Sequence, residues 1–310
     1  MKHLLSITDL STETLTELVH AGLNLAKGAK DFLPLKGKVI GIYFLKPSTR
    51  TRTSFAVGGI RLGGSLIGYG SDDLQLVTGE SLSDTGKVLG SYIDLLVIRT
   101  NESVQEMQEL ANGSDMAVIN ALSVNEHPTQ AIADLITIRE ALGRLEDVHI
   151  LYLGEGNNTA ASLALAVSMT PNMRMTLVTP EGYGLPDDTL EKINYFAQQN
   201  DSQVEQHHQV DRLPKHVDVV YTTRWESMGV LRTEQNWRRK FEPYRVTSTL
   251  MQEVAKSERT FFLHDLPAIR GSEVASEVID GSNSLVFRQA YHKLTSAMVA
   301  LTWCSGAKFS

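Results

Sequence analysis

The sequence predicts an α/β protein built from two doubly wound parallel sheets. Short, nearly continuous apolar runs alternate with helix-like runs along most of the chain, and the alternation breaks near Gly143-Arg144 and then restarts. Continuous apolar runs are typical of strands that helices cover on both faces, as in parallel sheets. A length of 310 residues is also enough for two domains of ordinary size.

The first half of the chain contains four apolar runs that we expect to be strands. These are residues 39–45, 65–69, 95–99 and 116–121. Ser11 is suited to cap a helix before them, because the apolar positions that follow it share one helix face. Those positions are Leu15, Leu18, Val19 and Gly22. The later helices of this half are expected at 52–62, 82–91, 104–112 and 129–142.

The second half repeats this alternation, with strands expected at 148–153, 175–179, 217–222 and 261–264. A last helix is expected over 286–303. We therefore expect one domain over 1–142, a second over 143–285, and a C-terminal helical segment over 286–310.

Composition and charge narrow the function classes. The chain is 42% hydrophobic and 21% charged, as in a globular protein, and its net charge of −7 argues against general nucleic-acid binding. One cysteine, Cys304, excludes an intramolecular disulfide and a cysteine metal cluster, and His207-His208 lacks metal-ligand spacing. Asp9 and Glu13 interrupt an N-terminal signal core, and no apolar run is long enough to span a bilayer. We expect a cytoplasmic protein without metal or cofactor.

The stretch Ser48-Thr49-Arg50-Thr51-Arg52 lies between the first expected strand and the next helix. Ser48 and Thr49 are natural N-cap residues, and a helix start leaves backbone N–H groups free at the positive end of the helix dipole. Hydroxyl and guanidinium groups add further donors, and Arg binds phosphate bidentately. The stretch therefore predicts a phosphate site, and a capped surface helix with solvated arginines is the alternative.

Other polar residues also follow the expected strands, at the carboxyl ends where ligands of parallel sheets bind. Along the chain these residues are Ser48, Arg99, His127, Asn157, Thr223, Arg224 and Asp265. We expect the strand ends of both halves to converge on an interdomain cleft, which suits an enzyme with two substrates.

Four short motifs occur in order along the chain, and together they are specific although each alone is weak. They are Ser48-Thr49-Arg50-Thr51-Arg52, His127-Pro128-Thr129-Gln130, Ser227-Met228-Gly229 and His264-Asp265-Leu266-Pro267. Over nearly its whole length the chain resembles the aspartate and ornithine carbamoyltransferases, whose carbamoyl phosphate motif the first stretch matches. The resemblance implies transfer of the carbamoyl group of carbamoyl phosphate to an amino-acid amine, a role in arginine metabolism, and a C-terminal helix that packs on the first domain.

The resemblance also implies which residues bind carbamoyl phosphate. The phosphate is expected to contact Ser48, Thr49, Arg50 and Thr51. Arg99 and His127, helped by Thr51, are expected to polarise the carbonyl oxygen, and the amide oxygen of Gln130 to accept from the carbamoyl NH₂. Lys293 lies where ornithine-type members have an arginine, and we expect it to contact the same substrate. No covalent nucleophile is required for this reaction.

Gln75 lies in a polar loop, residues 71–75, that resembles the family loop reaching the neighbouring subunit's site. On this interpretation Gln75 completes the carbamoyl phosphate site of the next subunit, and the enzyme is a homotrimer with shared sites. An exposed loop without this role is the alternative. The loop lacks the lysine of the aspartate-specific branch, so Gln75 is closer to the ornithine-type pattern.

The acceptor half departs from the ornithine-type pattern at three positions. The residues expected to contact the acceptor are Asn157, Asn158, Thr223, Arg224, Ser227, Met228, Asp265 and Leu266. Thr223 occupies the place of an ornithine-type Asp, and Arg224 is reminiscent of the aspartate branch. In the fourth motif Asp265 replaces a Cys.

These departures move the charges expected around the acceptor. Thr223 removes an anionic anchor for an α-ammonium group, and Arg224 is suited to pair with a carboxylate. An anionic Asp265 would favour the ammonium form of the reacting amine, but it is also suited to accept the amine proton or to bind a second cationic group. We expect an acceptor with a carboxylate and an amine, such as a diamino acid shorter than ornithine. An ordinary ornithine or aspartate carbamoyltransferase with compensated substitutions is the alternative.

Two interpretations of other classes remain open. Gly154-Glu155-Gly156 follows a strand and opens a helix, as in a dinucleotide fingerprint, but Thr159 stands where a third glycine is usual. A non-catalytic carbamoyl phosphate-binding or regulatory protein would keep the first half of the site and lose catalysis in the second.

Overall fold

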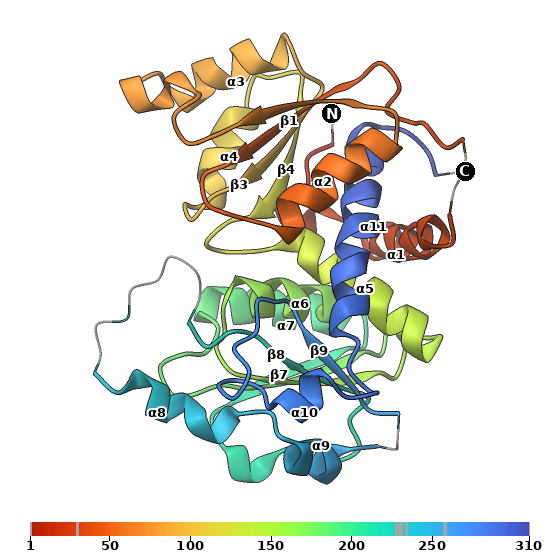
Figure 1. Ribbon diagram of the computed structural model, residues 1–310, viewed down its shortest axis with the longest axis vertical. Helices are drawn as coiled ribbons and strands as arrows, with labels where there is room; N and C mark the ends of the chain where they lie inside the picture. Colours follow the sequence, from red (N-terminus) through yellow and green to blue (C-terminus); the bar gives the residue numbers. More distant parts are fainter. Residues whose placement is uncertain (1, 29–30, 227–231, 233–234, 257–258, 310) are drawn as a thin grey trace. The chain divides into compact units, whose positions relative to one another are not determined.

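The computed structural model describes residues 2–28, 31–226, 232, 235–256 and 259–309 (Figure 1). The chain divides into two compact units, Met1–Ile136 with Tyr291–Ser310, and Thr137–Ala290. Each unit contains one sheet whose paired strands all run parallel. The predicted α/β class with two parallel sheets is therefore confirmed.

The sheet of the first unit has the strand order β2-β1-β3-β4. Its strands are β1 (Val39–Phe44), β2 (Ser65–Tyr69), β3 (Leu95–Arg99) and β4 (Ala117–Leu122). The central strands β1 and β3 are almost entirely buried, which explains their continuous apolar sequences. From β1 the chain moves outward to β2 and then returns to β3 on the other side, so the strand order reverses between β1 and β3.

Helices cover both faces of this first sheet (Figure 1). They are α1 (Thr12–Ala26), α2 (Arg50–Arg61), α3 (Leu82–Gly90), α4 (Val104–Ala111), the start of α5 (Pro128–Leu142) and most of α11 (Val286–Cys304). Apolar side chains of α3 and α4 pack with Leu96, Ile98 and Val118 on one face. On the other face α2 approaches α11 closely, because Gly58 has no Cβ and one placed there would lie 3.1 Å from Met298 Cγ.

The sheet of the second unit has the strand order β7-β6-β5-β8-β9. Its strands are β5 (His149–Leu153), β6 (Arg174–Val178), β7 (Gln203–His207), β8 (Val219–Thr222) and β9 (Phe261–His264). Strand β7 was not predicted from the sequence. This strand lies at the edge of the sheet and is partly exposed, so its sequence, Gln-Val-Glu-Gln-His, has no apolar run.

The helices of the second unit are α6 (Asn158–Ser168), α7 (Asp187–Gln199), α8 (Trp237–Phe241), α9 (Ser248–Val254) and α10 (Ser276–Ile279), together with the rest of α5 and the first residues of α11. Val254 of α9 and Ile279 of α10 pack against Leu151, Val220 and Phe262 of the sheet. Among the described residues no helix is long and apolar enough to cross a membrane.

Each sheet therefore has one point where the strand order reverses, between β1 and β3 in the first unit and between β5 and β8 in the second. Ligands of open parallel sheets bind at the carboxyl ends of the strands beside such a point. Ligand-binding residues are therefore expected in the loops that follow β1 and β3, and in those that follow β5 and β8.

Candidate functional site

In the first unit, the loop after β1 runs directly into α2. The helix begins at Arg50, two residues earlier than predicted, and Thr49 is its N-cap residue but makes no side-chain cap bond. The side chains of Ser48 and Thr49 are thus not used as predicted for capping. The first turn of a helix has N–H groups without intrahelical acceptors, at the positive end of the helix dipole, and Thr51 is buried in this turn. The arrangement suits an anion.

Three cationic or basic side chains are buried at the strand ends of the first unit. Arg99, at the end of β3, is 5% exposed, His127 is 3% exposed and Lys293 of α11 is 8% exposed. Lys293 Nζ lies 3.5 Å from His127 Nε2. Burial lowers the pKa of His127 well below its ordinary value, and the charges of Lys293 and Arg99 lower it further, so the imidazole is neutral near pH 7.

Gln130 connects this cluster to a carboxylate that the sequence analysis did not single out. Lys293 Nζ donates a hydrogen bond to Gln130 Oε1, and Gln130 Nε2 donates to Asp134 Oδ1 at 2.7 Å. Asp134 is fully buried one helix turn beyond Gln130 in α5. The amide oxygen predicted to accept from the carbamoyl NH₂ thus already accepts from Lys293, although a carbonyl oxygen has two lone pairs and is able to accept twice.

Gln75 lies apart from this cluster in the sequence, at the start of the short 3-10 helix η2 (Gln75–Thr78). Its side chain is exposed, and its Oε1 accepts a hydrogen bond from Thr78 Oγ1 at 2.7 Å.

In the second unit, the residues that follow β5 and β8 contact one another. Asn157 is the N-cap of α6, where its Oδ1 accepts from the backbone N–H groups of Thr159 and Ala160. Its Nδ2 donates to Thr223 Oγ1 at 3.1 Å, and Tyr152 Oη lies 3.2 Å from the same hydroxyl. Thr223 is 1% exposed. The two loops at the strand-order reversal are therefore joined through a neutral hydroxyl at the position expected to distinguish this chain from ornithine-type members.

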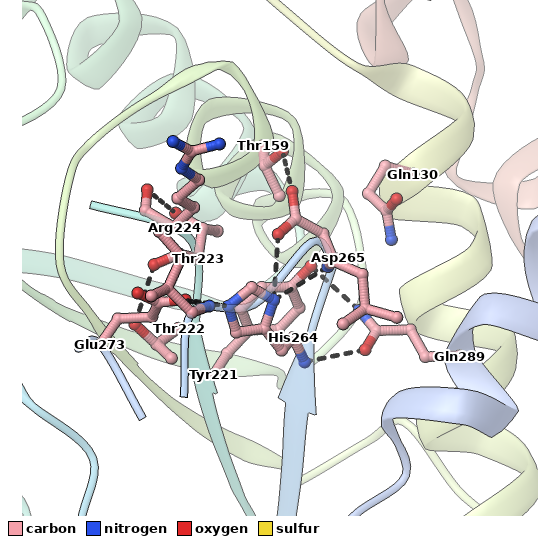
Figure 2. A network of polar contacts seen from close by, with 12 residues as sticks. Gln130, Thr159, Tyr221, Thr222, Thr223, Arg224, His264, Asp265, Glu273 and Gln289 are labelled. Atoms are coloured by element: carbon pink, nitrogen blue, oxygen red, sulfur yellow. Dashed lines mark hydrogen bonds and ion pairs between the residues drawn. The ribbon is translucent and has the colours of Figure 1, made fainter. Parts of the chain in front are cut away.

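Asp265 follows β9 and is held by its neighbours in the second unit (Figure 2). Its Oδ2 accepts a hydrogen bond from Thr159 Oγ1 at 3.1 Å. Its Oδ1 lies 3.5 Å from His264 Nδ1, but that nitrogen accepts from the Leu266 backbone N–H at 2.8 Å. His264 therefore carries its proton on Nε2, which points to Glu273 Oε1 at 3.3 Å. Asp265 keeps a partly exposed carboxylate that Thr159 orients.

Glu273 and Gln289 support this end of β9, and neither was predicted from the sequence. Glu273 is fully buried, and its Oε1 accepts from the backbone N–H of Ile269 as well as from His264. Gln289 accepts from the His264 backbone N–H at 2.9 Å and donates to Tyr221 Oη at 3.0 Å, which links β9 to β8 (Figure 2). Neither residue belongs to a recognisable motif, so only the folded chain identifies them.

The remaining predicted acceptor residues are less enclosed or lie outside the described residues. Arg224 is about one third exposed, and its Nη2 lies 3.7 Å from Glu226 Oε2. Asn158 is the first residue of α6. Ser227 and Met228 lie outside the described residues.

Comparisons with known proteins give the same assignment for both halves of the chain. Residues 2–140 match the family described as aspartate/ornithine carbamoyltransferase, carbamoyl-P binding domain. Residues 146–304 match the family described as aspartate/ornithine carbamoyltransferase, Asp/Orn binding domain.

Individual relatives match along almost their whole length. An ornithine carbamoyltransferase from Oceanobacillus iheyensis is 40% identical over 96% of this chain and 92% of its own length. One from Methanobrevibacter smithii is 38% identical, over 97% and 98% respectively. The solved structure of ornithine carbamoyltransferase from Pyrococcus furiosus superposes with a TM-score of 0.92 at 34% identity, over 99% of this chain and 98% of that one.

Two family models, one for each half, and relatives of this identity agree with the four motifs and with the two parallel sheets. The chain belongs to the aspartate/ornithine carbamoyltransferase family and is a carbamoyltransferase of the ornithine carbamoyltransferase type.

Proposed function

We propose that this enzyme carbamoylates an amine of a diamino acid shorter than ornithine, giving a ureido amino acid and phosphate. The observation that carries the proposal is the position of the anion in the second unit. Thr223, after β8, is neutral and bound to Asn157, whereas the carboxylate lies one strand away, at Asp265 after β9. Adjacent strands are about 4.8 Å apart. Moving the anionic anchor by this distance changes the length of acceptor that fits.

In the proposed reaction the acceptor nitrogen attacks the carbonyl carbon of carbamoyl phosphate. The C–N bond forms, the C–O bond to the phosphate breaks, and phosphate leaves. Arg99 and neutral His127 donate to the carbonyl oxygen as its negative charge grows, while the start of α2 with Ser48 to Thr51 holds the phosphate. Asp265 accepts the proton that the amine loses, and Thr159 keeps the carboxylate in place for it.

Ornithine is the second candidate acceptor, and the names of the relatives favour it. The Oceanobacillus and Methanobrevibacter proteins are both named ornithine carbamoyltransferase. With ornithine as its acceptor the enzyme would make citrulline in arginine metabolism, and the changes at Thr223, Arg224 and Asp265 would be compensated substitutions.

The test is phosphate release from carbamoyl phosphate with ornithine, 2,4-diaminobutyrate, 2,3-diaminopropionate and aspartate, each product identified by mass. Highest kcat/KM with one of the two shorter diamino acids supports the proposal. Highest kcat/KM with ornithine or aspartate rejects the shorter acceptor and leaves an ordinary family member. No release with any amine, in a protein that still binds carbamoyl phosphate, indicates a non-catalytic binding protein.

The proposed assembly is a homotrimer in which Gln75 serves the neighbouring subunit. Large apolar side chains are exposed on the first unit, in α2, β2, η2, α3 and just beyond α3: Ile60, Ile67, Val77, Val88 and Tyr92. Light scattering gives the mass of the assembly. Mixing inactive Gln75→Ala and His127→Ala subunits under exchange conditions restores part of the activity if sites are shared, and restores none if each chain works alone.

A further inference from the structure

Arg232 carries a buried charge that the reaction described above does not use. Its side chain is 6% exposed. Its Nη2 atom contacts Glu155 Oε1 at 2.7 Å and donates to the backbone carbonyl oxygen of Trp225 at 2.6 Å. Glu155 is itself only 15% exposed. Both charged groups are therefore largely desolvated, and each stabilises the charge of the other.

Aromatic rings surround the Arg232 guanidinium. Its central carbon lies 4.5 Å from the ring centroid of Trp237, 4.8 Å from that of Tyr183 and 5.2 Å from that of Phe241. Trp225, Trp237 and Phe241 form one buried cluster, against which Tyr183 packs. A planar guanidinium stacks on such rings while it keeps its hydrogen bonds, which an ammonium group does less well.

The two groups that Arg232 contacts belong to the two loops of the candidate acceptor site. Glu155 lies in the loop after β5, and its carbonyl oxygen accepts from Tyr152 Oη at 2.7 Å and from the Asn157 N–H at 2.9 Å. Trp225 lies in the loop after β8, two residues beyond Thr223. Arg232 thus contacts both loops, which the hydrogen bond from Asn157 to Thr223 also connects.

The loop after β5 has little freedom to adapt if this connection is lost. A Cβ on Gly156 would lie 2.5 Å from backbone atoms of Gly184 and Leu185, and the Gly156 N–H donates to the Tyr183 carbonyl oxygen at 2.7 Å. The loop therefore contacts both the Tyr183–Leu185 backbone and the Arg232 side chain. A shift on the Arg232 side moves Glu155 and, through it, Asn157.

We propose that Arg232 is a positioning residue for the acceptor amino acid, acting through Glu155 on Asn157 and through Trp225 on Thr223. The inference rests on the proposed function, because it assumes that Asn157 and Thr223 contact the acceptor. Arg232 itself contacts neither reacting group. Its loss raises the KM of the acceptor and leaves the KM of carbamoyl phosphate, which binds to the first unit, unchanged.

The experiment compares Arg232→Met, Arg232→Lys and Glu155→Gln with the wild type. The matched control is Arg270→Met, which removes an exposed arginine paired with Asp280 in the same unit. Misplacement of a substrate by about 1 Å costs up to about a hundredfold in rate. We therefore expect Arg232→Met to lower kcat/KM for the acceptor about ten- to a hundredfold, mainly through a higher acceptor KM. Arg232→Lys and Glu155→Gln are expected to raise it less, and Arg270→Met to stay within about twofold of the wild type.

A merely structural role would give a different pattern. It would lower the unfolding midpoint of the Arg232 and Glu155 variants while the KM values of the two substrates stayed at wild-type levels or rose in parallel, and either result overturns the proposal. If Arg232→Met does not fold, the KM values of Glu155→Gln provide the test, because this substitution keeps the shape of the side chain and removes only its charge.

Tryptophan fluorescence separates failure of this inference from failure of the proposed function. Trp225 and Trp237 are two of the three tryptophans in the chain, and Arg232 contacts both. Each amino acid of the panel is titrated in the presence of inorganic phosphate, so that no turnover occurs. If the wild type binds an amino acid, weaker binding in Arg232→Met with an unchanged phosphate affinity supports the role of Arg232, whichever amino acid it is. If the wild type binds none, both proposals fail.

Discussion

The two units differ in the charged groups at their strand ends. In the first unit Arg99, Lys293 and neutral His127 are almost completely buried, and Asp134 lies behind Gln130. In the second unit the carboxylate of Asp265 follows β9, beside the Thr159 hydroxyl and a histidine, His264, whose Nδ1 accepts a hydrogen bond. The first arrangement suits a phosphate dianion and a developing oxyanion, whereas the second suits an ammonium group.

The departures expected from the ornithine-type pattern are concentrated in the second unit. The motif residues that bind carbamoyl phosphate by resemblance are kept in the first unit, apart from Lys293. The departures gather in the second unit, at Thr223, Arg224 and Asp265. We therefore expect choice of acceptor to be separable from binding of carbamoyl phosphate, so that changes in one unit affect the KM of only one substrate.

The largest effect is expected from Arg99→Met. A donor to a developing oxyanion is worth about 10²- to 10³-fold in kcat. Arg99 also carries a positive charge that is almost completely buried. We expect kcat/KM for carbamoyl phosphate to fall about a thousandfold, measured by phosphate release. A fall of less than tenfold in the folded variant would remove Arg99 from the reaction.

Asp265→Asn tests the second unit in the same way. The amide keeps the shape and the hydrogen bond from Thr159 but loses the negative charge and the basic oxygen. We expect kcat/KM for the acceptor to fall about a hundredfold, while the KM of carbamoyl phosphate stays the same. A rise in the KM of carbamoyl phosphate as large as the change measured for the acceptor would contradict the separation of the two units.

Lys293→Met tests the electrostatic effect of Lys293 on His127 in the first unit. Removal of the Lys293 charge takes away one of the causes that lower the pKa of His127, so this pKa moves up toward its ordinary value. Burial and Arg99 still lower it, so the return is partial. NMR titration of the imidazole, assigned with His127→Gln, measures the pKa, and an unchanged titration would show that Lys293 has no influence on His127. We also expect the KM of carbamoyl phosphate to rise about tenfold.

The lowered pKa of His127 makes the stability of the folded chain depend on pH. The pKa of His127 is lower in the folded chain than in the unfolded chain, so the unfolded chain binds the proton first as the pH falls. The contribution of His127 to the free energy of unfolding is therefore complete above pH 6.5 and decreases below it. Urea unfolding at several pH values is expected to show a weaker decrease in Lys293→Met than in the wild type.

The smallest effect is expected from Thr223→Val. The change removes the hydroxyl that Asn157 and Tyr152 contact and leaves the buried volume nearly unchanged. We expect the free energy of unfolding to fall by about 1–2 kcal/mol, because Asn157 loses a buried hydrogen-bond partner. The KM of the acceptor should rise about threefold. Urea unfolding and initial rates measure the two effects, and Thr176→Val, on the same sheet, is the control for loss of a buried hydroxyl.

Much of the fold could be predicted because buried parallel strands have distinctive sequences. The run at β3, Leu-Leu-Val-Ile-Arg, is apolar up to the residue that ends it. The edge strand β7 has no such run, because part of it faces solvent, and it was missed. The helix α2 begins at Arg50, two residues earlier than predicted, and Thr49, one of the two residues expected to cap it, is its N-cap residue.

The motif residues could be named from the sequence, but their partners could not. Lys293 and Gln130 are 163 positions apart, and Arg232 and Glu155 are brought together only by the order of β5 and β8. Asp134 and Glu273 occur in no motif, and their burial, which makes them informative, is a property of the folded chain. Local patterns predict local structure, whereas buried polar networks depend on which distant segments meet.

The most direct test of the central claim is the ratio of kcat/KM for 2,4-diaminobutyrate to that for ornithine, in the wild type and in Thr223→Asp/Asp265→Cys. The double substitution returns the anion from β9 to β8, as in the ornithine-type pattern. The account predicts a ratio above one in the wild type and a fall of at least about tenfold in the double variant. A wild-type ratio below one, unchanged by the double substitution, would contradict the claim that the second unit of this enzyme selects a shorter acceptor.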